Sequence, residues 1–228
     1  LGSRPPLPVS EGLRVIYAEA FRGCTALKSV TLPSTLREIG ECAFADCPNL
    51  SEIVLNEGLR YIGYRAFGSS SDDEEEMVFN AKLTSVNIPS SVYYLEGEIF
   101  LGCTNLTEIT GGEGIEECGS NPFGWNVPAF SHAEVSADGT PLPFKVHKIG
   151  KIVLGFQGLC PTRLPAADFG DALMIADNAF DADYGPSVSN LVSLALPDTI
   201  QIIGWSAFNG ASSLVDIDFG GNSSQMHI

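Results

Sequence analysis

The sequence predicts a solenoid, in which the chain winds into short coils that stack on one another. Three observations carry this prediction. Phenylalanines recur at a nearly fixed interval: Phe21, Phe44 and Phe67 lie 23 residues apart, and Phe100 and Phe123 repeat that step. Residues 13–35 and 36–58 are near copies, LRVIYAEAFRGCTALKSVTLPST and LREIGECAFADCPNLSEIVLNEG. Longer steps reach Phe180 and Phe208, each equal to one unit plus an insertion, and such a period is typical of stacked repeats.

Within each unit, the order of residue types predicts a strand, a turn and a stacking pair. Val30 and Leu32 alternate with polar residues as in a half-buried strand, and Pro33 ends the strand because proline cannot donate to a ladder. A second apolar pair, a glycine turn and then Ala43-Phe44 follow. One coil alone has too few apolar groups to fold, so stacking must remove them from water. We expect one inner ladder of equivalent positions: Val30, Ile53, Val86, Ile109, Leu194 and Ile217.

The repeated pattern is L-x-x-I-G-x-x-A-F-x-x-C-x-x-L-x-x-I-x-L-P, with its cysteine at Cys24, Cys47 and Cys103. It resembles the BspA-like class of leucine-rich repeat over about residues 13–123 and 172–219. The resemblance implies a right-handed, α/β-type leucine-rich-repeat solenoid of short strands, turns and short helical or 3-10 segments. It also implies a protein of the cell surface or a secreted protein that binds host proteins or other cells, although fold alone does not fix function.

We expect a proline-rich lead-in at residues 1–12 and a single domain at 13–228. About seven repeats fill that domain, near 13–35, 36–58, 59–91, 92–114, 115–171, 172–199 and 200–228. The chain starts without a recognisable signal peptide and stops soon after a strand-like segment, without a polar capping repeat. We therefore expect it to be part of a longer chain or complex.

The formal net charge of −16, from 12 Lys and Arg against 28 Asp and Glu, argues against a nucleic-acid or anionic-membrane partner. It either suits a basic partner or only keeps the protein in solution. No apolar run approaches the ~18 residues of a membrane-spanning helix, so we expect no membrane insertion. The acidic run at residues 72–76 lacks the spaced oxygens and turn glycine of a calcium loop, and a solvated loop explains it more simply.

Six cysteines allow fifteen disulfide pairings, but a simpler interpretation places Cys24, Cys47 and Cys103 in a small buried slot of the coil. Without a C-x-x-C motif and with three histidines, the sequence predicts no metal site. No phosphate-binding loop, H-E-x-x-H or G-x-S-x-G motif is present, so we expect no cofactor, no catalytic residues and no enzyme activity.

The fifth repeat carries an insertion at about residues 124–151, and Asp138-Gly139 within it is a hairpin turn signal. We expect a β-hairpin that protrudes from the solenoid and that can be deleted without loss of folding. Insertions in repeats often map to the binding face. The candidate partner-binding residues are Trp125, Phe130, His132, Phe144, Lys145, His147, Lys148 and Lys151. The alternative is that this hairpin packs its aromatic residues on the solenoid.

Two further surfaces are weaker candidates. The outward positions of the strands are small and polar, with few of the aromatic and arginine residues that dominate binding energy. Tyr61, Tyr64, Tyr93 and Tyr94 either form an aromatic patch or pack between coils. Asn49, Asn105 and Asn222 fit the N-glycosylation pattern, which is weak evidence for secretion.

The sequence therefore predicts a non-enzymatic module that binds a protein ligand, is secreted or exposed at the cell surface, and is adhesive. The alternative is a structural or docking subunit of a larger intracellular or organellar assembly.

Overall fold

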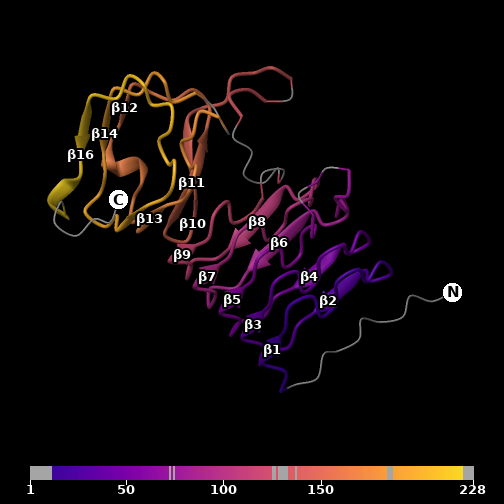
Figure 1. The fold of residues 1–228 in the computed structure, drawn as a ribbon. Coiled ribbons are helices and arrows are strands. Elements are labelled where there is room, and N and C mark those ends of the chain that lie inside the picture. Colours follow the sequence, from indigo (N-terminus) through magenta and orange to yellow (C-terminus); the bar gives the residue numbers. More distant parts are fainter. Residues whose placement is uncertain are drawn as a thin grey trace. The chain divides into compact units, whose positions relative to one another are not determined.

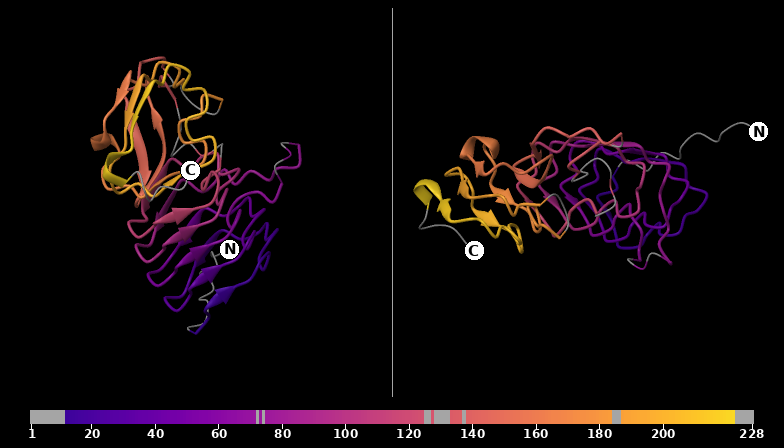
Figure 2. Two further views of the ribbon diagram at one scale, coloured as in Figure 1. Left: turned by 60° about the vertical axis from the view of Figure 1, so that its left-hand side comes forward. Right: turned by 90° about the horizontal axis from the view of Figure 1, so that it is seen from above.

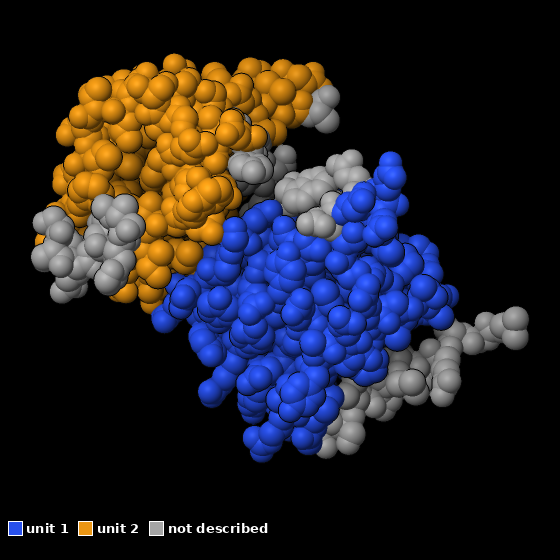
Figure 3. Space-filling view, in the orientation of Figure 1, with its two compact units in different colours: residues 1–129 blue, residues 130–228 orange. Residues whose placement is uncertain are grey.

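The computed structural model describes residues 12–71, 73, 75–124, 127, 133–136, 138–183 and 187–222. The chain divides into two compact units, unit 1 (residues 1–129) and unit 2 (residues 130–228), which Figure 3 colours separately. Each is described by itself. This division into compact units is not a count of folding domains, so a single domain at 13–228 stays a prediction.

Unit 1 contains a parallel sheet with one short strand from each of five successive coils. Its order is β1-β3-β5-β7-β9, a row that Figure 1 shows from indigo to magenta. The strands are β1 (Val15–Ile16), β3 (Glu38–Ile39), β5 (Tyr61–Ile62), β7 (Tyr94–Leu95) and β9 (Glu117–Cys118). The second residue of each strand is buried and the first faces outward, as the period-2 geometry of a strand requires. From the sequence, the buried position of each strand was expected only as the second member of an apolar pair before a turn, such as Ile39 after Leu36.

The L-x-x-I-x-L-P segments form the strands predicted for them. They are β2 (Ser29–Thr31), β4 (Glu52–Val54), β6 (Ser85–Ile88) and β8 (Glu108–Gly111), paired in parallel as β2-β4 and β6-β8. Each of the first four coils of unit 1 thus carries strands on two sides, which the left view of Figure 2 shows as successive rungs. The predicted inner ladder is buried at four of its six positions, Val30, Ile53, Val86 and Leu194. Ile109 is half-buried, and Ile217, on the last strand, is exposed, so the prediction is wrong there.

The phenylalanines of unit 1 stack in one row, as the spacing predicts. Ring centroids lie 5.0 Å apart for Phe21–Phe44, 5.5 Å for Phe44–Phe67, 5.7 Å for Phe67–Phe100 and 6.3 Å for Phe100–Phe123. Interplanar angles of at most 14° make the rings nearly parallel. The row is therefore the continuous apolar spine that a coil cannot build alone.

The residue two positions before each of these phenylalanines has a left-handed backbone, although none is glycine. The residues are Glu19, Cys42, Arg65, Glu98 and Asn121 in unit 1, and Asn178 and Ser206 precede Phe180 and Phe208 in unit 2 in the same way. A positive φ is strained for a residue that carries a Cβ, least so for Asn. The recurrence shows that coil stacking imposes this turn whatever residue occupies it.

Unit 2 begins with an antiparallel pair, β10 (Lys145–Ile149) and β11 (Ile152–Gln157), and continues with parallel strands. One sheet has the order β10-β11-β13-β15, with β13 (Met174–Ile175) and β15 (Ile202–Ile203). The other has the order β12-β14-β16, from β12 (Arg163–Leu164), β14 (Ser193–Ala195) and β16 (Asp216–Asp218). In the described residues, helix is limited to two 3-10 turns, η2 (Ala166–Asp168) and η3 (Gly220–Asn222).

Phe156 supplies a rung of the unit 2 row that the sequence analysis passed over. Its ring lies 5.2 Å from Phe180, which lies 4.9 Å from Phe208. Gly155 precedes Phe156 in place of the usual alanine, and the coil around it forms β11 and β12. The predicted fifth repeat, 115–171, therefore holds strands of two coils, and the β-solenoid has about eight turns.

The cysteine slot of the repeat is buried at Cys47 and Cys103, whereas Cys24, in the first coil, is half-buried. Cys47 and Cys103 are at most 1% exposed, and their thiols lie 3.4 Å and 3.6 Å from the carbonyl oxygens of Phe21 and Phe67. All six cysteines have free thiols in the structure. Asn80 fills the same slot in the third coil, three residues before Leu83.

Candidate functional site

The predicted turn at Asp138-Gly139 forms a small hairpin. Val135 bridges Pro141 in antiparallel fashion, and the Ser136 amide donates to the Thr140 carbonyl at 2.8 Å. The Asp138 carboxylate accepts from Ser136 Oγ at 2.5 Å and from the Thr140 amide at 3.1 Å, and these bonds lower its pKa to about 2. In Figure 1 this loop projects from the body of unit 2.

The described candidate residues lie on a different hairpin. Phe144, Lys145, His147 and Lys148 lie on or just before β10, and Lys151 lies in the turn between β10 and β11. They do not lie on a protruding hairpin, because β10 pairs with β11, which is itself part of the repeat sheet through β13. Trp125, Phe130 and His132 lie outside the described residues.

Several of these side chains contribute to the fold. Phe144 is half-buried, and its ring lies 5.7 Å from that of Phe156 at a 42° tilt. Lys148 Nζ donates to the Phe169 carbonyl at 2.9 Å and forms an ion pair with Asp171 at 3.3 Å. Deletion of 124–151 would remove these contacts together with β10, so we no longer expect it to leave folding intact.

Lys145 and His147 lie on alternate positions of β10. Lys145 is exposed, whereas His147 is half-buried. Burial, with a smaller contribution from the charge of Lys145, lowers the pKa of His147. Lys145, His147 and Lys151 thus remain the described candidates that are not part of the aromatic interior.

The outward face of β2, β4, β6 and β8 is a polar surface whose hydrogen bonds run from coil to coil. Ser51 Oγ donates to the Lys28 carbonyl at 3.1 Å, and Thr110 Oγ1 donates to Asn87 Oδ1 at 3.0 Å. Val54, 37% exposed, is one of the few large apolar side chains on it. These side chains tie neighbouring coils together and leave the face polar.

Most of the tyrosine cluster serves coil packing. The Tyr61 and Tyr94 rings stack at 5.7 Å, and the Tyr61 hydroxyl donates to Glu96. Burial, together with the nearby Glu96 carboxylate, raises the pKa of Tyr61. Tyr64 donates to Glu98 at 2.8 Å. Tyr93 differs, because 54% of it is exposed.

The other sequence motifs show structural roles. Nδ2 of Asn49 donates to the Thr25 carbonyl and that of Asn105 to the Ala81 carbonyl, both at 2.8 Å, so the repeat uses the amides that a glycan would need. Asp73, Glu75 and Glu76 of the acidic run are exposed. Within the described ranges, no group of His, Cys, Asp and Glu side chains is arranged to hold a metal ion. Nowhere in the described part of the chain does a helix have the length and apolar composition needed to cross a bilayer.

One signal was overlooked in the sequence. Arg14, Arg37 and Arg60 follow the first leucine of three consecutive units, in L-R-x-I, at the same 23-residue spacing as the phenylalanines. The positions compared between units were those of the L-x-x-I-x-L-P strand, which do not include these arginines. Aligning this position across the units would have found the three arginines.

The BspA type leucine rich repeat region is the protein-family model that matches this chain, in six copies over residues 7–77, 74–138 and 174–227. Repeats of this type are generally protein-binding or adhesion modules and are typically not enzymes. No curated protein matches the chain.

Several solved structures resemble the chain at low sequence identity. A leucine rich cell surface protein from Faecalibacterium prausnitzii shares 21% identity (TM-score 0.40) over 94% of this chain and 62% of its own. The pneumococcal vaccine antigen PcpA shares 16% identity (TM-score 0.43) over 92% of this chain and 57% of its own. A leucine-rich repeat protein from Bacteroides ovatus shares 17% identity (TM-score 0.43) over 92% of this chain and 53% of its own. This chain thus spans about three-fifths or less of each of them.

Proposed function

We propose that this chain, which belongs to the BspA-type leucine-rich repeat family, is a non-enzymatic adhesive module that binds a protein ligand at the cell surface or after secretion. The observation that carries the proposal is the stack of coils itself. Coil after coil presents outward side chains in fixed register, such as Ser29 beside Glu52 and Ser85 beside Glu108. Such a stack offers a long rigid surface, which suits contact with another macromolecule.

The proposed contact surface includes the turn between β10 and β11. Lys151 lies in that turn and Lys145 at the opposite end of β10, on a protein whose formal net charge is −16. Basic side chains along one hairpin of an acidic protein favour the approach of an acidic partner there. His147 lies on the same strand and adds a half-buried ring beside the lysines.

The test is affinity capture from the native source with the full chain as bait, followed by mass spectrometry. The bait pair is the native chain and Lys145→Glu/Lys151→Glu. The matched control, Lys28→Glu/Arg163→Glu, makes the same change of net charge at exposed sites elsewhere. We expect the β10 variant to recover at least fivefold less partner while the control recovers native amounts. Equal recovery by all three baits would exclude this surface.

Exposure at the cell surface is tested separately. Protease treatment of intact source cells should remove the protein while a cytosolic marker survives, or the protein should be found in the culture medium. Retention of the intact protein inside protease-treated cells would favour the alternative, a docking subunit of an internal assembly.

A further inference from the structure

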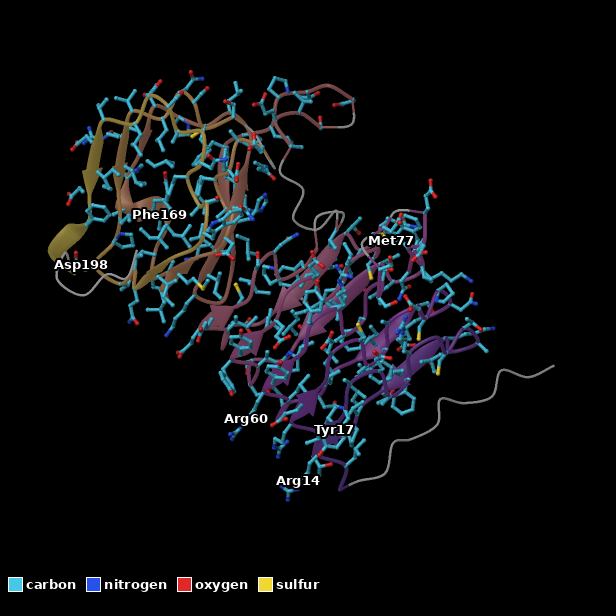
Figure 4. The ribbon with its side chains drawn as sticks, in the orientation of Figure 1. Arg14, Tyr17, Arg60, Met77, Phe169 and Asp198 are labelled. Carbon is cyan, nitrogen blue, oxygen red and sulfur yellow. The ribbon has the colours of Figure 1, made fainter. Side chains whose placement is uncertain are left out.

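Three arginines form a column on one edge of unit 1, at the residue before each of the first three strands of the five-stranded sheet, β1, β3 and β5. The Arg37 amide donates to the Arg14 carbonyl and the Arg60 amide to the Arg37 carbonyl, both at 2.8 Å. The three residues therefore lie on consecutive coils, at the strand spacing of about 4.8 Å, so that Arg14 and Arg60 are separated by roughly 10 Å. Figure 4 shows Arg14 and Arg60 along the same rim of unit 1, with their side chains pointing away from the ribbon.

The charges of this column are not paired with acidic side chains of the described residues. In the described part of the chain, no carboxylate forms an ion pair with any of the three arginines. Glu57, three residues before Arg60, instead accepts the backbone amides of Ser90 at 3.1 Å and Ser91 at 3.2 Å. Like charges in neighbouring positions of a sheet repel one another. A bound anion would remove that repulsion.

Arg37, the central arginine, is held in place before any ligand arrives. Its Nη1 donates to the carbonyl oxygens of Ser34 at 2.9 Å and Leu36 at 3.0 Å. The guanidinium lies over Gly58, where a Cβ would come within 2.4 Å of Nη1. Nε and Nη2 have no acceptor among the described residues. A fork oriented in this way loses less entropy when it binds a carboxylate.

The column continues into an exposed aromatic residue and ends at an acidic one. Tyr93 donates its amide to the Arg60 carbonyl at 3.1 Å, and Glu116 does the same to Tyr93 at 3.1 Å. The order along the edge is therefore three positive charges, an exposed ring and a negative charge. Arg and Tyr are the residue types that dominate binding energy at protein interfaces. The terminal carboxylate gives the column a direction, since it repels an acidic group at that end.

We propose that the edge formed by Arg14, Arg37, Arg60 and Tyr93 binds a short acidic peptide segment of a partner protein. From Arg14 to Tyr93 the column spans about 14 Å, the length of four to five extended residues. The segment would place two or three carboxylates on the arginines and one apolar or aromatic side chain on Tyr93.

The charge of the whole molecule selects a short ligand over a long polyanion. Screening limits electrostatic effects to about 8 Å at physiological salt, so a short segment interacts mainly with the column. A nucleic acid or sulfated polysaccharide would extend over the rest of a chain that has 28 acidic residues. The partner class rests on the proposed protein-binding function, but this surface is separate from β10.

Fluorescence anisotropy of a labelled ten-residue peptide, with four consecutive Glu or Asp residues followed by Phe, tests the proposal on the full chain. The same peptide with Gln and Asn in place of Glu and Asp, the neutral twin, is the ligand control. Arg14→Gln/Arg37→Gln/Arg60→Gln should weaken binding of the acidic peptide at least tenfold, and Tyr93→Ser about threefold. The matched variant Lys28→Gln/Lys82→Gln/Arg163→Gln has the same net charge and changes exposed basic residues outside the arginine column and the β10–β11 hairpin. It should bind within twofold of the native chain.

Circular dichroism must first show that the variants are folded. Arg14→Gln alone, at an exposed end of the column, gives a second measurement, and we expect it to weaken binding of the acidic peptide about threefold. The proposal would be overturned if the two triple variants weakened binding equally or if the neutral peptide bound as tightly as the acidic one. Tighter binding of heparin or single-stranded DNA than of the acidic peptide would also overturn it. If the peptide fails but capture through β10 succeeds, the proposed function stands and only this surface is excluded.

Discussion

Unit 1 and unit 2 are built from the same repeat, but they fill their interiors differently. In unit 1, the ladder phenylalanines form one row of nearly parallel rings, and each ring stacks on the next. In unit 2, the row is shorter, and two further rings contact it at a tilt: Phe144 against Phe156 at 42° and Phe169 against Phe180 at 55°. Figure 4 shows Phe169 inside the coils of unit 2.

This difference shows how an insertion changes the packing of aromatic side chains inside a solenoid. A uniform coil needs one aromatic residue per turn, supplied at fixed spacing. The coil that contains β11, β12 and η2 is longer, and extra aromatic residues from irregular positions occupy its interior. The repeat rule therefore predicts unit 1 almost position by position and unit 2 only where its spacing is kept.

The largest expected effect comes from removing one ring in each row. Phe67→Ala should lower the free energy of unfolding by about 3–5 kcal/mol, because Phe67 is fully buried between two rings. Phe180→Ala should fall at the upper end of that range, since Phe180 contacts three rings. Chemical denaturation followed by circular dichroism measures both. Phe21→Ala, at a 40% exposed end of the row, is the control and should have at most about half the effect. A larger loss for Phe21 than for Phe67 would contradict the stacking model.

The cysteine slot of unit 1 offers a stabilising change. Asn80 is 2% exposed, and neither atom of its amide finds a partner in the described structure. Asn80→Cys restores the residue of the neighbouring slots and should raise the free energy of unfolding by about 1–2 kcal/mol, because it removes an unsatisfied buried amide. The shift of the denaturation midpoint under reducing conditions measures it, with Asn80→Asp as the control expected to destabilise. A lower midpoint for Asn80→Cys would mean that the amide has a partner.

The left-handed turn allows a finer comparison of the two units. Ser206 in unit 2 and Asn121 in unit 1 occupy the same position, with φ of 53° and 44°. Ser206→Gly should stabilise by about 0.5–1 kcal/mol, because relief of strain exceeds the added entropy of the unfolded chain. Asn121→Gly should change little, since Asn tolerates this conformation. Equal gains at the two sites, by thermal unfolding, would show that the residue type does not matter there.

The smallest expected effect is a pH dependence of stability that arises from His147 on β10. Burial lowers the pKa of His147 below its unfolded value, so the unfolded chain takes up a proton that the folded chain does not. Stability should therefore fall as the pH drops below about 6.5 and stop falling below the folded pKa. Denaturation midpoints at pH 7.5 and 5.5 measure this change, and His147→Gln should reduce it. An unchanged pH response in that variant would assign the effect to other groups.

The interactions that repeat from coil to coil were readable in the sequence, and those made once were not. The phenylalanine row, the strands that begin at Ser29 and Glu52, and the buried cysteine slot follow from spacing and residue type. Strands of two residues, such as Glu38–Ile39, were missed because two positions cannot display a period. Phe156 was missed because glycine replaced the alanine before it.

The candidate surfaces follow the same division. The basic residues of the insertion were visible in the sequence. Only the three-dimensional structure shows that Lys148 donates a hydrogen bond to the Phe169 carbonyl, forms an ion pair with Asp171, and lies on a strand that joins the repeat sheet. The arginine column could have been found from its 23-residue spacing. Its unpaired charges and the fixed orientation of Arg37 could not, because they depend on where Glu57 and Gly58 lie.

The sequence by itself determined that this protein is a stack of short coils, because the same apolar residues recur at one interval and no single coil could bury them. The tertiary structure alone decided which strand β10 pairs with and which charged groups are neutralised. Those outcomes depend on contacts that are made only once, such as the β10–β11 pairing and the bonds from Lys148 to Phe169 and Asp171, and such contacts leave no repeated pattern in the chain.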